Sequence, residues 1–176
     1  MKSTLDDLIA RRSIRSYTGE QITDEDLNLI LEAGTYAPSG QGHQSAVIVV
    51  VQNKAVITKL SKLNADALNM RDVDPFYGAP TVLAVLADKT KATPYEDGCL
   101  ILGNLMNAAY AVGLGSCWIH RGKEVFEMEE GKELLRKWGL DNGNYMGIAF
   151  CLLGYPAENP GAKPRKKGFI IRDTAA

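Results

Sequence analysis

Two clusters of basic residues, near opposite ends of the chain, are the clearest candidates for binding a ligand. Arg11, Arg12, Ser13 and Arg15 place three guanidinium groups and a hydroxyl within five residues. Because arginine binds phosphate oxygens through two parallel hydrogen bonds, this segment suits a phosphate monoester. The segment 163–167 holds four more basic residues. Taken alone, each cluster also fits a solvated basic turn or tail, but together they indicate one anionic ligand held from both sides.

The segment 38–44, Pro-Ser-Gly-Gln-Gly-His-Gln, is a third candidate binding segment. Its glycines let backbone amides come close to a ligand, and Ser39 and Gln44 offer side-chain donors and acceptors. Such a loop suits the polar edge of a planar heterocycle, although an ordinary connection between a helix and a strand explains it as well. We interpret His43 as a surface residue of this loop rather than as a catalytic base.

The segment 113–120, Gly-Leu-Gly-Ser-Cys-Trp-Ile-His, is a fourth candidate, whose backbone amides could point at a ring nitrogen. Its two glycines end a helix instead of opening one, so it lacks the G-x-G-x-x-G dinucleotide fingerprint. A nucleophilic pair of Cys117 and His120 is one interpretation, and a buried structural cysteine is the favoured one. No residue is therefore assigned as a catalytic acid, base or nucleophile.

Composition narrows the class of protein. The 176 residues are 45% hydrophobic and 23% charged, as in ordinary globular domains, and the net charge of −1 excludes a cationic field over the whole surface for nucleic acid. Three scattered cysteines and two histidines argue against a disulfide framework or a metal site. Asp6 and Asp7 stand where a signal peptide needs an apolar run, which predicts a cytoplasmic protein, and no apolar stretch is long enough for a membrane span.

The hydrophobic pattern predicts the elements that position these segments. Thr23 and Asp26 form a capping box, and Ile22 and Leu27 a hydrophobic staple, so a helix is expected to begin there. Other helices are expected after Ser3 and at 54–63, 96–112 and 125–138. Apolar runs predict strands at 46–51, 81–87, 116–119, 145–155 and 169–172, with an irregular stretch at 64–80. Without repeats or linkers, the chain is expected to form a single α+β domain over residues 1–176.

Taken in order, these segments resemble the FMN-dependent nitroreductase family, and specifically its short members. The resemblance rests on Arg-Arg-Ser-x-Arg-x-Tyr at 11–17, Ala-Pro-Ser-Gly-Gln-Gly-His-Gln at 37–44, the helix and turn at 104–109 and 113–118, and the closing strand and arm at 153–158 and 163–165. Two departures stand out in the loop. Gly42 replaces the family's asparagine, and Ser45-Ala46 replace its Pro-Trp pair.

The resemblance implies which residues hold FMN. The phosphate and ribityl hydroxyls would be bound by Arg11, Arg12, Ser13, Arg15, Lys163 and Arg165. The flavin would be faced by Pro38, Ser39, Gly40 and Gly42 of the loop, from the partner subunit, with Gln44 on its pyrimidine edge. Asn64 would lie near the isoalloxazine, and the backbone of Ile119, His120 and Arg121 would approach the ring near N5.

The resemblance also implies a fold and an activity. The expected fold is a mostly antiparallel sheet flanked by helices, in a homodimer with FMN at the interface and the C-terminal segment exchanged between subunits. The expected activity is ping-pong hydride transfer from NADH or NADPH through FMN to a nitroaromatic or quinone, with no nucleic-acid or membrane partner. The alternatives are a flavin-binding carrier or sensor with little turnover, and a nucleic-acid-binding or nucleotide-binding domain with a basic tail.

Overall fold

The computed structural model describes residues 4–70 and 72–174, with a four-stranded antiparallel sheet at its centre. The strands follow the order β1-β2-β4-β3, so β1 and β3 are the two edges. Their bounds are β1 Ala46–Val51, β2 Thr81–Asp88, β3 Gly115–Ile119 and β4 Tyr145–Gly154. The four strands predicted between residues 46 and 155 are therefore confirmed, each within one residue of its expected bounds.

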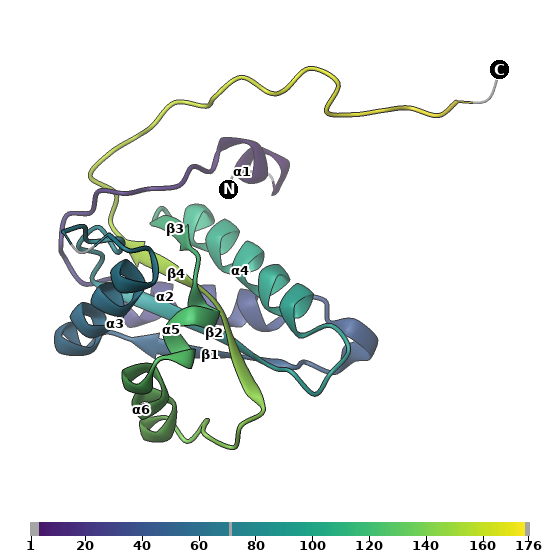
Figure 1. The fold of residues 1–176 in the computed structure, drawn as a ribbon. Helices are drawn as coiled ribbons and strands as arrows, with labels where there is room; N and C mark the ends of the chain where they lie inside the picture. Colours follow the sequence, from purple (N-terminus) through teal and green to yellow (C-terminus); the bar gives the residue numbers. More distant parts are fainter. Residues whose placement is uncertain (1–3, 71, 175–176) are drawn as a thin grey trace.

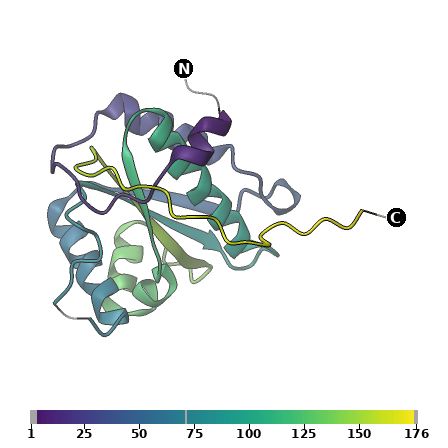
Figure 2. The ribbon, with the colours of Figure 1, turned by 90° about the horizontal axis from the view of Figure 1, so that it is seen from above.

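Helices cover both faces of this sheet (Figures 1 and 2), so β2 and β4 are almost wholly buried. One face carries α2 Asp24–Thr35 and α4 Pro94–Ala111, and the other carries α3 Lys54–Ala67, α5 Gly122–Glu127 and α6 Glu129–Lys137. Side chains of β2 alternate between the two cores, as Leu83 and Val85 pack with α2 and α4, whereas Val82 and Ala84 pack with the other three helices. None of the described helices combines the length and apolar character that spanning a membrane requires.

The start of α2 confirms the predicted N-cap at Thr23 and the staple, whereas Asp26 accepts from the Thr23 hydroxyl rather than from its amide as a capping box requires. Thr23 Oγ1 accepts a hydrogen bond from the amide of Asp26 at 3.1 Å and donates to its carboxylate at 2.8 Å. Ile22 and Leu27 are buried in the same core cluster. Capping of this kind satisfies amides that the first helical turn leaves without partners. The cap therefore fixes the start of α2, the helix that leads into the 38–44 loop.

Two predicted boundaries are wrong. The helix expected to end at Leu63 continues to Ala67, because Asn64 and Ala65 are buried and continue its packed face. The single helix expected over 125–138 is two helices, α5 and α6, separated by extended backbone at Met128 (φ −70°, ψ 154°). A Cβ on Gly131 would lie 1.9 Å from the carbonyl oxygen of Val125, so glycine permits the close approach of α6 to α5.

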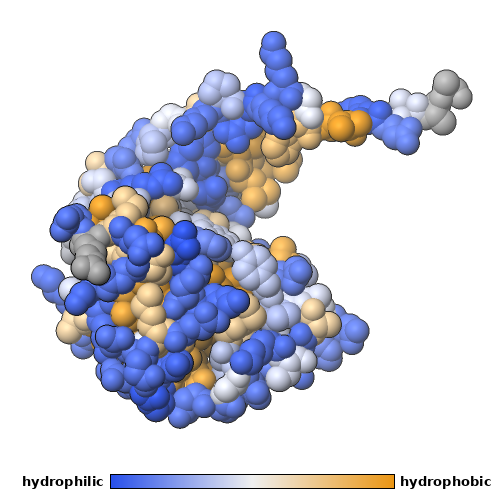
Figure 3. Space-filling view, in the orientation of Figure 1, coloured by the Kyte–Doolittle hydropathy of each residue, from blue (hydrophilic) through white to orange (hydrophobic). Residues whose placement is uncertain are grey.

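The two ends of the chain lie apart from the sheet. Helix α1 Thr4–Ala10 has no buried residue, and its predicted cap, Ser3, lies outside the described residues. After β4 the chain continues as an exposed arm that stands away from the body (Figures 1 and 3). The strand predicted at 169–172 does not form within this chain, and Phe169, Ile170 and Ile171 are 75–90% exposed. The arm leaves the body before reaching these residues, so they have no strand of their own chain to pair with.

Candidate functional site

The arginine segment 11–15 lies along the outer side of β3. The amide of Ile14 donates to the carbonyl oxygen of Ser116 at 2.9 Å, and Ser13 and Ser116 form a parallel bridge. Tyr17 forms an antiparallel bridge with Pro156, beyond the end of β4, and its hydroxyl donates to the carbonyl oxygen of Ile14 at 2.7 Å. The chain from 13 to 17 therefore follows the edge of the sheet, which fixes where the preceding arginines lie.

The three arginines of this segment differ in what they contact, through side chain or backbone. Arg12 Nη1 donates to the carbonyl oxygens of Ile9 and Arg11, at 2.8 and 2.6 Å. The amide of Arg15 donates to Glu158 Oε1, on the arm. Arg11 Nη1 is buried, and no group in the described ranges 4–70 and 72–174 accepts a hydrogen bond from it. A buried cationic donor without an acceptor is costly, so this position favours an anionic ligand.

The two cysteines beneath this segment are structural. Cys117 and Cys151 are buried, which raises the pKa of both thiols. At Cys117, the charges of Arg15 and Arg11 lower the pKa but do not cancel the effect of burial. A raised pKa keeps both groups as thiols at neutral pH, whereas a nucleophilic cysteine needs a thiolate. The predicted burial of Cys117 is confirmed, and no Cys/His nucleophile is assigned.

Asn64 and the backbone that follows β3 come together in the structure. Asn64 is fully buried in α3, and its Nδ2 donates to the carbonyl oxygen of His120 at 2.7 Å. Its Oδ1 is also buried, yet finds no donor within the described part of the chain. Next to His120, Arg121 adopts the left-handed backbone conformation (φ 72°) just before α5 begins. The predicted contacts Asn64, Ile119, His120 and Arg121 thus form one group at the end of β3.

Close packing against β4 sets the position of this group. A Cβ on Gly122 would lie 2.7 Å from the amide nitrogen of Ala149, and one on Gly147 would lie 2.2 Å from the carbonyl oxygen of Gly122. The register between β2 and β4 shifts between Val85 and Leu86, which pair with Ala149 and Gly147. Bulges of this kind redirect a strand and often lie near functional sites. Two glycines and a bulge therefore place the first turn of α5 directly on the sheet.

The loop 38–44 lies at the opposite edge of the sheet, where it leads into β1. It contains the short helix Gly40–Gly42, and Gln41, Gly42 and Gln44 all have positive φ angles. Ser39 Oγ accepts from the amide of Gln44 at 2.9 Å. Pro38, Ser39 and Gln44 share the lining of a cavity of about 460 Å³ with apolar residues of α2, α4 and β1.

The loop and the arginine segment are separated by most of the length of α4. The loop is bonded to Asp97 near the beginning of α4, whereas Arg12 shares a cavity of about 560 Å³ with Tyr110 near its end. At about 1.5 Å per residue, Asp97 and Tyr110 are about 20 Å apart along the helix axis. One chain therefore does not bring the two predicted halves of the flavin site together.

The basic residues of the arm are exposed. Arg165 Nε and Nη2 donate to the carbonyl oxygen of Lys163 at 3.2 and 2.7 Å. The arm stands away from the body (Figures 1 and 3), and the side chains of Lys163 and Arg165 are exposed.

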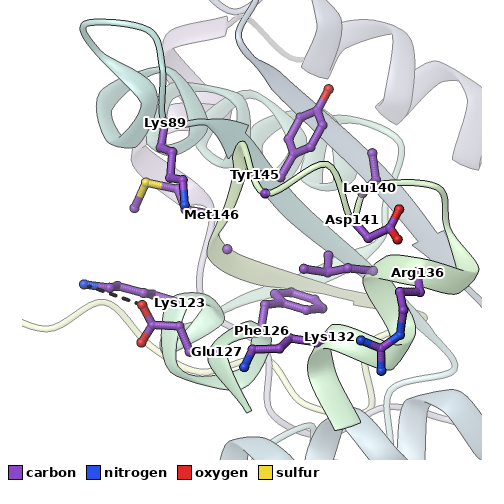
Figure 4. A pocket seen from close by; sticks show the side chains of 13 residues that line it. Lys89, Lys123, Phe126, Glu127, Lys132, Arg136, Leu140, Asp141, Tyr145 and Met146 are labelled. Atoms are coloured by element: carbon purple, nitrogen blue, oxygen red, sulfur yellow. Dashed lines mark ion pairs between the residues drawn. The ribbon is translucent and has the colours of Figure 1, made fainter. Parts of the chain in front are cut away.

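A separate cavity of about 590 Å³ lies between α5, α6 and the start of β4 (Figure 4). Its lining includes Phe126, Tyr145 and four basic residues, namely Lys89, Lys123, Lys132 and Arg136. Lys123 makes a 3.9 Å ion pair with Glu127, and Arg136 a 3.0 Å ion pair with Glu129. None of the residues predicted to bind FMN lines it, so it is distinct from the site at β3.

The sequence pattern did not single out Asp97, which is buried and hydrogen-bonded to the 38–44 loop at the β1 edge of the sheet. The available signal was an acidic residue near the start of a helix that is apolar on nearly every side. An acid in the first turn is ordinarily explained by the helix dipole, so the signal was ambiguous.

Comparison with known proteins identifies the family. The model of the Nitroreductase family matches residues 8–155. The FMN reductase [NAD(P)H] of Bacillus subtilis is 31% identical over 186 residues, covering 94% of this chain and 70% of that protein. The NADPH-flavin oxidoreductase of Vibrio harveyi is 28% identical over 182 residues, covering 97% and 73%. The crystal structure of a nitroreductase with bound FMN from Bacteroides fragilis superposes with a TM-score of 0.87 at 29% identity, covering 99% of this chain and all of that one. The chain belongs to the nitroreductase family.

Proposed function

We propose that this protein is an FMN-dependent NAD(P)H oxidoreductase that reduces electron-poor acceptors such as nitroaromatics or quinones. The names of its relatives support this reaction, since they include an NADPH-flavin oxidoreductase and an FMN reductase. The observation that carries the proposal in this chain is a pair of buried polar atoms near β3, Arg11 Nη1 and Asn64 Oδ1. Both are without partners in the described residues.

The chemistry of these two atoms fits FMN. A guanidinium N–H is a donor suited to phosphate oxygens, and an amide oxygen is an acceptor suited to an N–H group at the edge of a flavin ring. β3 lies close to both, because the arginine segment pairs with Ser116 of this strand and Asn64 is bonded to His120, just beyond its end. A ligand with an anionic end and a planar polar end would therefore satisfy both atoms, and FMN has both features.

The roles of the chain's own residues follow from this arrangement. Arg11 and Ser13 would hold the phosphate and ribityl groups, and Asn64 would orient the ring against the backbone of residues 119–121. FMN, when bound, supplies the hydride-accepting and hydride-donating chemistry. The buried thiol of Cys117 stays protonated because burial raises its pKa, so it supplies no nucleophile. The protein positions the cofactor and substrates, and no side chain is required as an acid or base.

We propose further that the complete site forms in a homodimer. The arginine segment and the 38–44 loop lie at opposite edges of the sheet, so a second copy is needed to bring a loop to the β3 side. The exposed residues Phe169–Ile171 provide an apolar segment that is suited to adding to a sheet edge. β1 has such an edge, where Val50 is 38% exposed. The same arm would carry Lys163 and Arg165 toward the phosphate.

The experiment is an anaerobic titration of the purified protein after incubation with FMN and gel filtration. We expect the flavin to co-elute with protein at the mass of a dimer, to bleach on addition of NADH or NADPH, and to regain its colour with a nitroaromatic or quinone. Protein that remains colourless contradicts the proposal. Flavin that is retained but is not bleached by either nucleotide would instead identify a carrier or sensor.

A further inference from the structure

Asp97 is the only buried residue with a charged side chain among those described, and the proposed reaction gives it no role. It lies in the first turn of α4, with 2% of its surface exposed. Its Oδ1 accepts from the amide of Gly40 at 2.9 Å and from Thr93 Oγ1 at 3.0 Å. Its Oδ2 accepts from Ser45 Oγ at 2.6 Å. One carboxylate thus joins α4 to both ends of the segment 40–45.

These hydrogen bonds keep Asp97 ionised. Burial acts to raise the pKa of its carboxyl group, but the hydrogen bonds from Ser45, Gly40 and Thr93 bring the pKa below its ordinary value. The charge of His43 acts in the same direction. Hydrogen bonds to a charged group are stronger than those between neutral groups. Removing either the buried carboxylate or one of its donors should therefore disturb the loop strongly.

The loop that Asp97 holds is strained and closely packed. Gln41 and Gln44 have φ angles of 53° and 49°, in the left-handed region that non-glycine residues rarely adopt. Such conformations persist only where the surrounding structure holds them. A Cβ on Gly40 would lie 2.1 Å from Thr93 Oγ1, so the loop approaches the start of α4 at a distance that only glycine permits. The loop conformation therefore depends on its contacts with Asp97 and Thr93.

We propose that Asp97 is a positioning residue for the flavin site of the partner chain. Its carboxylate holds the loop in the conformation that presents Pro38, Ser39 and Gly40 to FMN, about 20 Å along α4 from the arginine segment of its own chain. The inference rests on the proposed function, because contact between this loop and FMN is part of that function. Asp97 itself touches neither cofactor nor substrate in this arrangement.

The test compares Asp97→Ala, Asp97→Asn and wild type in the full chain, by FMN affinity and by hydrogen exchange at the Gly40 amide with and without FMN. For Asp97→Ala we expect Gly40 exchange to accelerate at least about tenfold and the FMN Kd to rise about tenfold, as the loss of a charged hydrogen bond predicts. Asp97→Asn keeps an Oδ1 acceptor and should restore most of both properties. Asp88→Ala is the matched control, since among the described residues this carboxylate accepts hydrogen bonds only from Thr90, in its own turn.

The outcomes separate this inference from the proposed function. Wild type that binds no FMN contradicts the proposed function itself. Wild type that binds FMN, with unchanged affinity in Asp97→Ala, overturns the positioning role alone. If Asp97→Ala does not fold, Gly40→Ala tests the same contact with the charge retained, because its Cβ would meet Thr93 Oγ1. A folded Gly40→Ala protein should also bind FMN about tenfold more weakly, and an unchanged Kd would again overturn the inference.

Discussion

Replacing Arg11 with alanine should weaken flavin binding without destabilising the flavin-free protein. Arg11 Nη1 is buried and lacks an acceptor among the described residues. If it donates to the FMN phosphate, the variant loses a charged hydrogen bond of about 1.5–3 kcal/mol. The FMN Kd should then rise roughly 10- to 150-fold. Without flavin the same group has no bond to lose, so the free energy of unfolding should stay unchanged or rise by up to about 1 kcal/mol.

The assay is a fluorescence titration with FMN, paired with urea unfolding of the flavin-free protein. Arg136→Ala is the control, because Arg136 forms an exposed ion pair with Glu129 at 3.0 Å and lies in a different cavity. It should leave the FMN Kd unchanged and cost at most about 1 kcal/mol of stability. The reasoning is refuted if Arg11→Ala binds FMN within twofold of wild type. It is also refuted if Arg11→Ala destabilises the flavin-free protein by more than the control does.

Two further predictions concern the parts of the fold that position the site. Gly147→Ala should destabilise the protein by about 1–3 kcal/mol in urea unfolding, because the new Cβ would lie 2.2 Å from the carbonyl oxygen of Gly122. Gly161→Ala, with no atom near the new Cβ, should leave stability unchanged, and equal effects of the two substitutions would contradict the packing argument. Cys117 and Cys151 should resist a thiol reagent in the folded protein, because burial both hides them and raises their pKa. Half-buried Cys99 should react first, and rapid labelling of all three before unfolding would show that the thiols are not protected.

Local patterns predicted most of the elements. The β-branched run at 46–51 and the apolar run at 81–87 could be recognised as strands because both are continuous apolar runs without breakers. The N-cap at Thr23 was equally local. The break at Met128 was not visible, because no proline or glycine stands there and the apolar period continues across it. It depends on the close approach of Gly131 to Val125, which is a tertiary contact.

The site could be predicted only segment by segment. The arginine segment and the loop 38–44 were both recognisable from residue type and spacing, but their separation at opposite edges of the sheet follows from strand order. The bond between Asn64 and His120 joins residues 56 positions apart, and that between Asp97 and Gly40 joins residues 57 apart. Such pairings have no local signature, so the sequence pattern predicts neither the helical position of Asn64 nor the hydrogen bonds of Asp97.

The most direct test of a flavin site shared between two chains is FMN stoichiometry in mixed dimers. One chain carries Arg11→Ala, which removes the phosphate contact, and the other carries Gly40→Ala, which displaces the loop. Each variant alone should retain little FMN at a concentration between the wild-type and variant Kd values. A mixed dimer should recover one intact site, and hence half of the wild-type stoichiometry, because one of its sites combines the unaltered halves of both chains. Mixed dimers that bind no more FMN than either variant alone would contradict the shared site.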